Sequence, residues 1–247
     1  MSGDRLWFIL LCILAPTFVA GQMPASDPID GQTELNHKRW ALMLQQYVDE
    51  SGKVNYTGFK QDESALADYL NYLGKHQPLG DATKEELLAY YINLYNAATI
   101  KLILEHYPVS SIRDIKQPWG RKWIAVGDQQ YSLNQIEHRI LRKLEEPRIH
   151  FAINCASISC PKLLKVPFEA KRLEQQLEEV TRGFINDSLN NKITPDKISL
   201  SALFKWYRND FTSSGSLQEY IRRYSKKPFA AKAKVEFIKY DWGLNEQ

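Results

Sequence analysis

The chain has 247 residues, of which 44% are apolar and 12% aromatic, enough for one well-formed core and at most two small domains. Lysine and arginine number 32 against 29 aspartates and glutamates, and neither sign forms a long block. This balance gives no reason to expect nucleic acid or an anionic membrane surface as a partner. We expect a single globular domain.

The first 21 residues have the pattern of a signal peptide. Arg5 precedes an apolar run from Leu6 to Ala15, and small residues at 19–21 offer a cleavage site. The run has about half of the roughly 20 residues that a membrane-spanning helix needs, so an uncleaved anchor is the less favoured alternative. Cleavage would remove Cys12 and leave no integral membrane segment. The mature protein is then expected to be periplasmic or secreted, where disulfides persist.

The segment after the signal peptide predicts a flexible lead-in followed by the globular domain. Residues 22–33 are rich in Pro, Asp, Ser and Gly, and the domain is expected over 34–247. Apolar residues at helical spacing predict amphipathic helices over 34–50 and 63–75.

The third predicted helix differs from the first two because it is apolar on nearly every face. Thr83 and Glu86 form a capping box, and helical residues continue from Leu87 to His106. Such a helix is surrounded by protein or lipid, and its amides and its lysine favour protein. We therefore expect it to be the central helix of the domain.

The C-terminal half mixes helices with short strands. Gly127-Asp128 predicts the turn of a hairpin over 123–132, and Ser132 with Gln135 predicts a capping box that opens a helix through Leu144. Further helices are expected over 168–185, 201–207 and 217–224, and further strands over 198–200 and 234–240. The sequence therefore predicts an α+β fold, mostly helical, around a buried central helix with a small β-sheet.

The stretch from His150 to Leu163, HFAINCASISCPKL, contains both cysteines of the expected mature protein. Its apolar residues 151–153 predict a short buried strand that runs into a loop. Pro161 then predicts the start of a helix, with Cys160 as its N-cap. Loops at the ends of buried elements often carry chemistry, so this stretch is the main candidate site.

Three interpretations of Cys155 and Cys160 stay open. Two thiols in an exported protein form a disulfide by default, and four intervening residues permit one. Alternatively one thiol is a nucleophile, because a helix N-cap would lower the pKa of Cys160, whereas burial would raise that of Cys155 unless His138 or His150 is near. Metal binding with one of these histidines is third, but the paired C-x-x-C spacing of zinc sites is absent. We expect no metal and no cofactor.

Glu137 is the most informative residue outside the thiol stretch. At about 100° per residue it falls within roughly 40° of the centre of the apolar stripe of its predicted helix. A buried carboxylate must be paired, hydrogen-bonded or protonated. In one interpretation Glu137 orients the neighbouring His138 for catalysis. In the other it fastens the helix to a core arginine, lysine or tyrosine.

Asn93 and Asn96 lie one turn apart on the predicted central helix. Buried amides need partners for their donors and their acceptor. These residues either orient a catalytic imidazole or bind a ligand carbonyl, or they clamp the backbone of a loop.

Four runs in order resemble the hallmark segments of the family catalogued as domain of unknown function 547: AYYINLYNAATIKLIL, YSLNQIEHRILR, HFAINCASISCPKL and LSALFKWYRNDF. The resemblance covers about residues 87–211 and implies a domain rather than a reaction, since the family's name states no activity. It matches the family's pattern at Glu137-His138, at Asn93 and Asn96, and at Ser157 to Pro161. Some members, notably those of plants, lack a thiol at the position of Cys155 or Cys160, which keeps Ser157 among the candidates.

These observations favour an exported thiol-dependent hydrolase or acyl-transfer enzyme acting on a peptide, amide or ester. Cys160 or Cys155 would be the nucleophile and His138 the general base. Glu137 would orient His138, and Asn93 or Asn96 would support the imidazole or the developing oxyanion.

The alternative from another class is a binding or scaffold domain, stapled by a Cys155–Cys160 disulfide. Its aromatic side chains would face a small-molecule, peptide or protein ligand: Trp119, Trp123, Trp206 and Tyr207. A redox role is a third option, disfavoured by the absence of a C-x-x-C motif.

Overall fold

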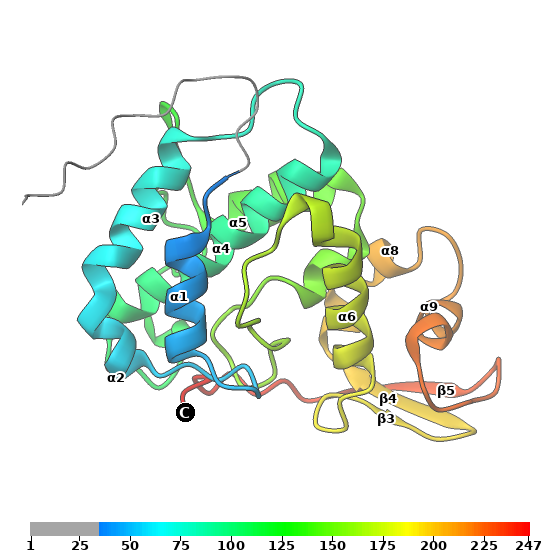
Figure 1. Ribbon diagram of the computed structural model, residues 1–247. Helices are drawn as coiled ribbons and strands as arrows, with labels where there is room; N and C mark the ends of the chain where they lie inside the picture. Colours follow the sequence, from blue (N-terminus) through cyan, green and yellow to red (C-terminus); the bar gives the residue numbers. More distant parts are fainter. Residues whose placement is uncertain (1–34) are drawn as a thin grey trace, which may run out of the picture. The chain divides into compact units, whose positions relative to one another are not determined.

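The computed structural model describes residues 35–247, so the predicted signal peptide and lead-in lie outside the described residues. The longer helices are α1 (Lys38–Tyr47), α3 (Glu63–Lys75), α4 (Lys84–His106), α6 (Leu173–Ile185) and α9 (Leu217–Tyr224). Short α-helical turns are α2 (Tyr56–Phe59), α5 (Leu133–Gln135), α7 (Leu203–Trp206) and α8 (Arg208–Phe211). The strands are β1 (Ile124–Val126), β2 (Gln129–Tyr131), β3 (Lys192–Ile193), β4 (Lys197–Ser201) and β5 (Lys234–Ile238). The fold is α+β and mostly helical, as predicted (Figure 1).

Helix α4 is the centre of the hydrophobic core. It begins at the predicted capping box, in which the Thr83 hydroxyl accepts from the Glu86 N–H and the Glu86 carboxylate accepts from the Thr83 N–H. Buried residues occupy every face between Leu88 and Leu104, and the helix contacts α2, α3 and α5. Its length and composition would allow it to cross a membrane, but 83% of its apolar window is buried inside the protein, the environment of a core helix.

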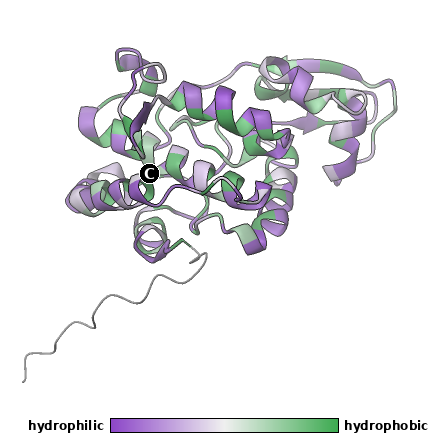
Figure 2. Cartoon of the chain, turned by 90° about the horizontal axis from the view of Figure 1, so that it is seen from above, coloured by the Kyte–Doolittle hydropathy of each residue, from purple (hydrophilic) through white to green (hydrophobic). Residues whose placement is uncertain are grey.

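The strands form two small sheets. β1 and β2 make the predicted hairpin, with Ile124 opposite Tyr131 and Gly127 in the left-handed region at φ +56°. The second sheet has the order β3-β4-β5, in which β3 is antiparallel and β5 parallel to β4. Figure 1 shows the chain after β5 running back toward α1 and α2. Hydrophilic and hydrophobic bands alternate along the outer helices, as expected when each buries one face (Figure 2).

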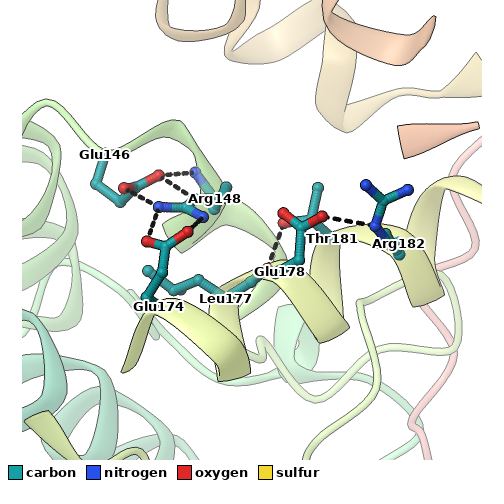
Figure 3. Close-up of polar contacts among 7 residues, drawn as sticks. All are labelled: Glu146, Arg148, Glu174, Leu177, Glu178, Thr181 and Arg182. Atoms are coloured by element: carbon teal, nitrogen blue, oxygen red, sulfur yellow. Dashed lines mark hydrogen bonds and ion pairs between the residues drawn. The ribbon is translucent and has the colours of Figure 1, made fainter. Parts of the chain in front are cut away.

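A partly buried arginine fastens the segment before the thiols to α6. Arg148 lies in the 3₁₀ helix η5 (Pro147–Phe151) and donates to the carboxylates of Glu146 and Glu174 at 2.7–2.8 Å. Figure 3 shows Arg148 between these two carboxylates, with Glu178 and Arg182 forming a separate pair further along α6. The carboxylates of Glu146 and Glu174 therefore tie η5 to α6 through Arg148.

Two predictions for the thiol stretch are wrong. Phe151 ends η5 rather than beginning a strand, and residues 152–154 are buried but irregular. No helix follows Pro161, so Cys160 is not a helix N-cap. A short apolar run has the same hydrophobic pattern in a buried strand and in a buried helical turn, and the sequence did not distinguish them.

Candidate thiol site

The side chains of Cys155 and Cys160 meet in the loop after η5. Their sulfurs lie 2.7 Å apart, and the Cys155 backbone N–H donates to Cys160 Sγ at 2.9 Å. The Tyr240 hydroxyl lies 3.3 Å from Cys155 Sγ and donates to Cys160 Sγ at 3.4 Å. Ser157 Oγ lies 3.3 Å from Cys155 Sγ and 2.8 Å from the Tyr240 hydroxyl. Two thiols and two hydroxyls thus form one cluster.

The two thiols differ in acidity and in exposure. Burial raises the pKa of Cys160, but hydrogen bonds from the Cys155 thiol, the Tyr240 hydroxyl and the Cys155 backbone outweigh it and lower the pKa to about 7. The hydrogen bond to Cys160 and burial raise the pKa of Cys155 well above its usual range. Cys160 is 9% exposed, whereas Cys155 is only partly buried. The first negative charge therefore resides on the Cys160 sulfur, and Cys155 is the more exposed residue of the two.

Amide side chains hold the thiol loop against α4. Asn96 Nδ2 donates to the Ala152 carbonyl at 3.0 Å, and Asn96 Oδ1 accepts from the Asn154 N–H at 2.8 Å. The Asn154 side chain in turn accepts from the Ala156 N–H and donates to the Pro161 carbonyl, both at 2.8 Å. The central helix thereby positions the backbone on both sides of the cysteines.

Ala156, between the first cysteine and Ser157, has φ +60° although it is not glycine. This left-handed conformation is unfavourable for a residue with a Cβ, and such residues concentrate at functional sites. Ala156 is fully buried, and its carbonyl accepts from the Asn245 N–H at 3.2 Å. The turn reverses the chain, so that Cys155 and Cys160 meet across four residues.

Asn93, the other amide on α4, does not touch the thiol loop. Its Nδ2 donates to the Phe168 carbonyl at 2.7 Å, and its Oδ1 accepts from the Phe168 N–H at 3.0 Å. Both asparagine side chains therefore bond to the backbone of a loop. This is the alternative that the sequence offered to a role toward a catalytic imidazole or a ligand carbonyl.

Glu137 lies in a π-helical turn rather than in a continuous α-helix. The capping box of Ser132 and Gln135 opens α5 as predicted, but residues 136–140 form the π turn η3 and residues 141–144 a 3₁₀ turn. The Glu137 carboxylate accepts from the Tyr207 hydroxyl at 2.5 Å and from the Tyr95 hydroxyl at 3.4 Å. Burial and Glu137 together raise the pKa of both tyrosines, which therefore remain hydrogen-bond donors. π turns are frequent at functional sites.

A second ionic group lies beside this carboxylate. Arg142 donates twice to Asp210, with both distances 2.7 Å, and His150 Nε2 lies 2.8 Å from the same carboxylate. Burial raises the pKa of Asp210, but these two partners outweigh it and hold it well below its usual range. The His150 ring stacks on Tyr207 at 3.8 Å, and His138 Nδ1 lies 3.2 Å from Arg142 Nη1.

Residues 79–185 match the family described as "Protein of unknown function, DUF547". The match supports membership of the DUF547 family for this stretch of the chain. Comparison with curated proteins and with solved structures found no match.

The DUF547 match contains every catalytic candidate named from the sequence, but it does not contain the whole site. Tyr207, Asp210 and Tyr240 lie beyond its end at residue 185. Among the described residues, no group of three or more His, Cys, Asp and Glu side chains is arranged to hold a metal.

The catalytic candidates of this chain fall into two groups and do not form a single Cys-His-Glu triad. Cys155, Cys160 and Ser157 are together, but within residues 35–247 no hydrogen bond joins Glu137 to His138 or either of them to a thiol. Tyr95 and Tyr207 lie between the groups, since each interacts electrostatically with Glu137 and with Cys155.

Sequence reasoning missed Tyr240 and Asp210 and named Tyr207 only as a surface aromatic. Tyr240 is 80 residues from Cys160 and ends a stretch that was predicted only as a strand, with no sign of a functional role. Asp210 is the penultimate residue of the run LSALFKWYRNDF, so the resemblance to the family offered a clue to it.

Proposed function

We propose that this DUF547 protein exchanges thiols and disulfides at Cys155 and Cys160. The observation that carries the proposal is the 2.7 Å contact between the sulfur of Cys155, a partly buried residue, and the sulfur of Cys160, whose pKa is about 7. The absence of C-x-x-C argued against a redox role in the sequence. The left-handed turn at Ala156 weakens that objection, because it brings cysteines at a wider spacing into contact.

The exchange begins from the disulfide form. A substrate thiolate attacks the Sγ of Cys155, the more exposed of the two residues, and forms a mixed disulfide with it. The bond between the two protein sulfurs breaks, and its electron pair goes to Cys160, which leaves as a thiolate. A thiol of low pKa is the better leaving group, so the donors around Cys160 favour attack at Cys155.

A second substrate thiolate completes the turnover. It attacks the substrate sulfur of the mixed disulfide and displaces Cys155, which takes up a proton. The balance is one substrate dithiol oxidised to a disulfide and one protein disulfide reduced to two thiols. Exchange is reversible, so the reduced protein would return to the disulfide form with glutathione disulfide as the oxidant.

The test is a single-turnover reaction of the protein, oxidised with glutathione disulfide, with dithiothreitol at pH 7. Alkylation followed by intact mass counts the thiols formed with time. We expect reduction at least about tenfold faster than that of free glutathione disulfide, because the leaving thiol has the lower pKa. The Cys160→Ser variant should accumulate a mixed disulfide on Cys155 with glutathione, and Cys155→Ser should not form one on the Cys160 thiol at a comparable rate.

A disulfide that resists dithiothreitol until the protein unfolds would contradict exchange. That outcome would favour the scaffold alternative, in which the pair is a staple. Chain-entropy estimates give a closed loop this short only about 2–3 kcal/mol of stabilisation.

The second candidate function is acyl transfer by the Cys160 thiolate, the hydrolase expectation from the sequence. It is favoured by the thiolate itself, which near pH 7 forms without a base in contact. Reduced protein and p-nitrophenyl acetate should then give a thioester on Cys160, visible in the intact mass and absent from Cys160→Ser. If His138 assists hydrolysis, His138→Ala should accumulate that thioester.

Export is part of the proposal. The basic residue, apolar run and small residues of the first 21 positions support a cleaved signal and a periplasmic or secreted protein. An oxidising compartment would keep the dithiol in use as a disulfide. The intact mass of the exported protein locates the cleavage.

A further inference from the structure

A groove of about 760 Å³ lies between residues 111–114 and 239–243, and one of its lining residues, Tyr240, belongs to the thiol cluster. Tyr240 and Trp242 are the aromatic residues of its lining. Trp206, 47% exposed, extends this aromatic surface: its ring stacks on Trp242 at 5.7 Å and lies 4.9 Å from Tyr240. An exposed tryptophan on a wall of further rings is a surface that binds flat apolar groups.

The charges of the groove are balanced. Arg113 and Lys239 line it together with Asp114 and Asp241, and none of these four forms an ion pair within residues 35–247. The Arg113 guanidinium instead lies over the Trp242 ring at 5.5 Å. Two charges of each sign do not select a strongly anionic or cationic ligand, so the rings determine what fits.

Tyr240 connects this groove to the sulfurs. It is one of the lining residues of the groove, its ring packs against Trp206 and Trp242, and its hydroxyl contacts Cys155, Cys160 and Ser157. A substrate side chain packed against these tryptophans is therefore separated from the thiols by the Tyr240 side chain. In a polypeptide, consecutive Cα atoms are about 3.8 Å apart, so a neighbouring residue can reach the sulfurs while the first stays in the groove.

We infer that the groove binds an aromatic side chain beside the reacting cysteine of a polypeptide substrate. This inference rests on the proposed thiol–disulfide exchange and names its substrate class. The volume is in the range of about 300–1,000 Å³ typical of ligand pockets, room for several residues of an extended peptide. A small thiol would leave the aromatic wall unused.

The test compares two short peptides that differ only beside their cysteine, one with phenylalanine and one with alanine. Each is reacted in its thiol form with the oxidised protein, and the ratio of the two rate constants is measured. We expect the phenylalanine peptide to react about three- to tenfold faster, the range of one aromatic contact. Trp206→Ala should bring the ratio close to one. Because both peptides react with the same thiols, a change in thiol reactivity affects both rate constants and cancels in their ratio. The control is Leu189→Ala, which removes an 84% exposed apolar side chain elsewhere and should leave the ratio unchanged.

A ratio of one in the unaltered protein, or a ratio that survives Trp206→Ala, would overturn the inference. Binding is measured separately by tryptophan fluorescence with peptides that carry serine in place of cysteine. The phenylalanine peptide should bind more tightly by a similar factor, and only when Trp206 is present. Absence of exchange together with this binding preference would reject the proposed function but not the groove, whereas equal binding would reject the groove.

Discussion

The acidity of Cys160 depends on a few donors, of which the Tyr240 hydroxyl comes from the most distant part of the chain. Tyr240→Phe keeps the ring and removes this donor to the thiolate, so the pKa of Cys160 should rise from about 7. Less thiolate is then present at neutral pH, and the alkylation rate should reach half its maximum at a higher pH. The rate of iodoacetamide modification between pH 5 and 10 measures this midpoint.

Tyr91→Phe is the matched control for that substitution. The Tyr91 side chain is partly buried against the core, and its hydroxyl donates to no group among residues 35–247. Its loss should leave the midpoint of alkylation unchanged. An unchanged midpoint in Tyr240→Phe as well would show that the Tyr240 hydroxyl does not stabilise the thiolate.

Single residues were predicted by type and burial, but not by partner. Helical spacing indicated that Glu137 is buried, and it is 7% exposed. It could not indicate that the partners are Tyr95 and Tyr207, because no local pattern brings residues 42 and 70 positions away to one carboxylate. The π turn also breaks the assumption of 100° per residue on which the relation of Glu137 to His138 rested.

Helix α4 offers a matched pair of amides for testing how an element positions the thiol loop. Asn93 and Asn96 are 1% and 3% exposed, and each makes two hydrogen bonds to loop backbone. Replacement of either by alanine leaves buried backbone groups without partners and should cost about 1–3 kcal/mol of unfolding free energy. Urea denaturation measures this loss.

Only Asn96→Ala should also change the thiols. Asn96 clamps Ala152 and Asn154, next to Cys155, whereas Asn93 clamps Phe168. The rate of Cys160 alkylation should shift in Asn96→Ala and stay constant in Asn93→Ala at equal pH. Equal effects of both substitutions would mean that the loop holds its geometry without the helix.

Whole elements were predicted best where periodicity runs long. The spacing of apolar residues and the capping box predicted α3 and α4, and the Gly127 turn predicted the β1–β2 hairpin. The apolar run of the thiol stretch, residues 151–153, is shorter than one helical turn, so it carried no usable period. Pro147 and the Glu146 cap were the signals that could have predicted η5 in place of a strand.

At the scale of the molecule, Asn245 connects three distant parts of the chain. Its side chain accepts from the Tyr56 hydroxyl at 2.7 Å, and its backbone bonds to Val54 and Ala156. Tyr56 is fully buried, so Asn245→Ala leaves its hydroxyl without a partner and should lower the unfolding free energy by about 1–3 kcal/mol. Gln247→Ala, at an exposed position of the same tail, should cost less than about 1 kcal/mol. Equal losses in the two variants would contradict the role of the Asn245 side chain.

Composition predicted one domain of the right class, yet the contacts that complete the site span most of the chain. Asn245 and Tyr56 are 189 residues apart, and the DUF547 match ends 55 residues before Tyr240. Such contacts arise only after the core has formed, and no window of sequence contains both partners. The thiol loop was therefore found from its cysteines, while the tail that surrounds it was not.

The position of Tyr240 also fixes the order in which the cluster is assembled during translation. Cys155 precedes Tyr240 by 85 residues, so at about 5–20 residues per second the ribosome adds the tyrosine some 4–17 seconds after the cysteine. Throughout that interval a nascent chain carries both thiols without the hydroxyl that contacts them. A polypeptide released before residue 240 would keep both cysteines and lack the Tyr240 hydroxyl that contacts them.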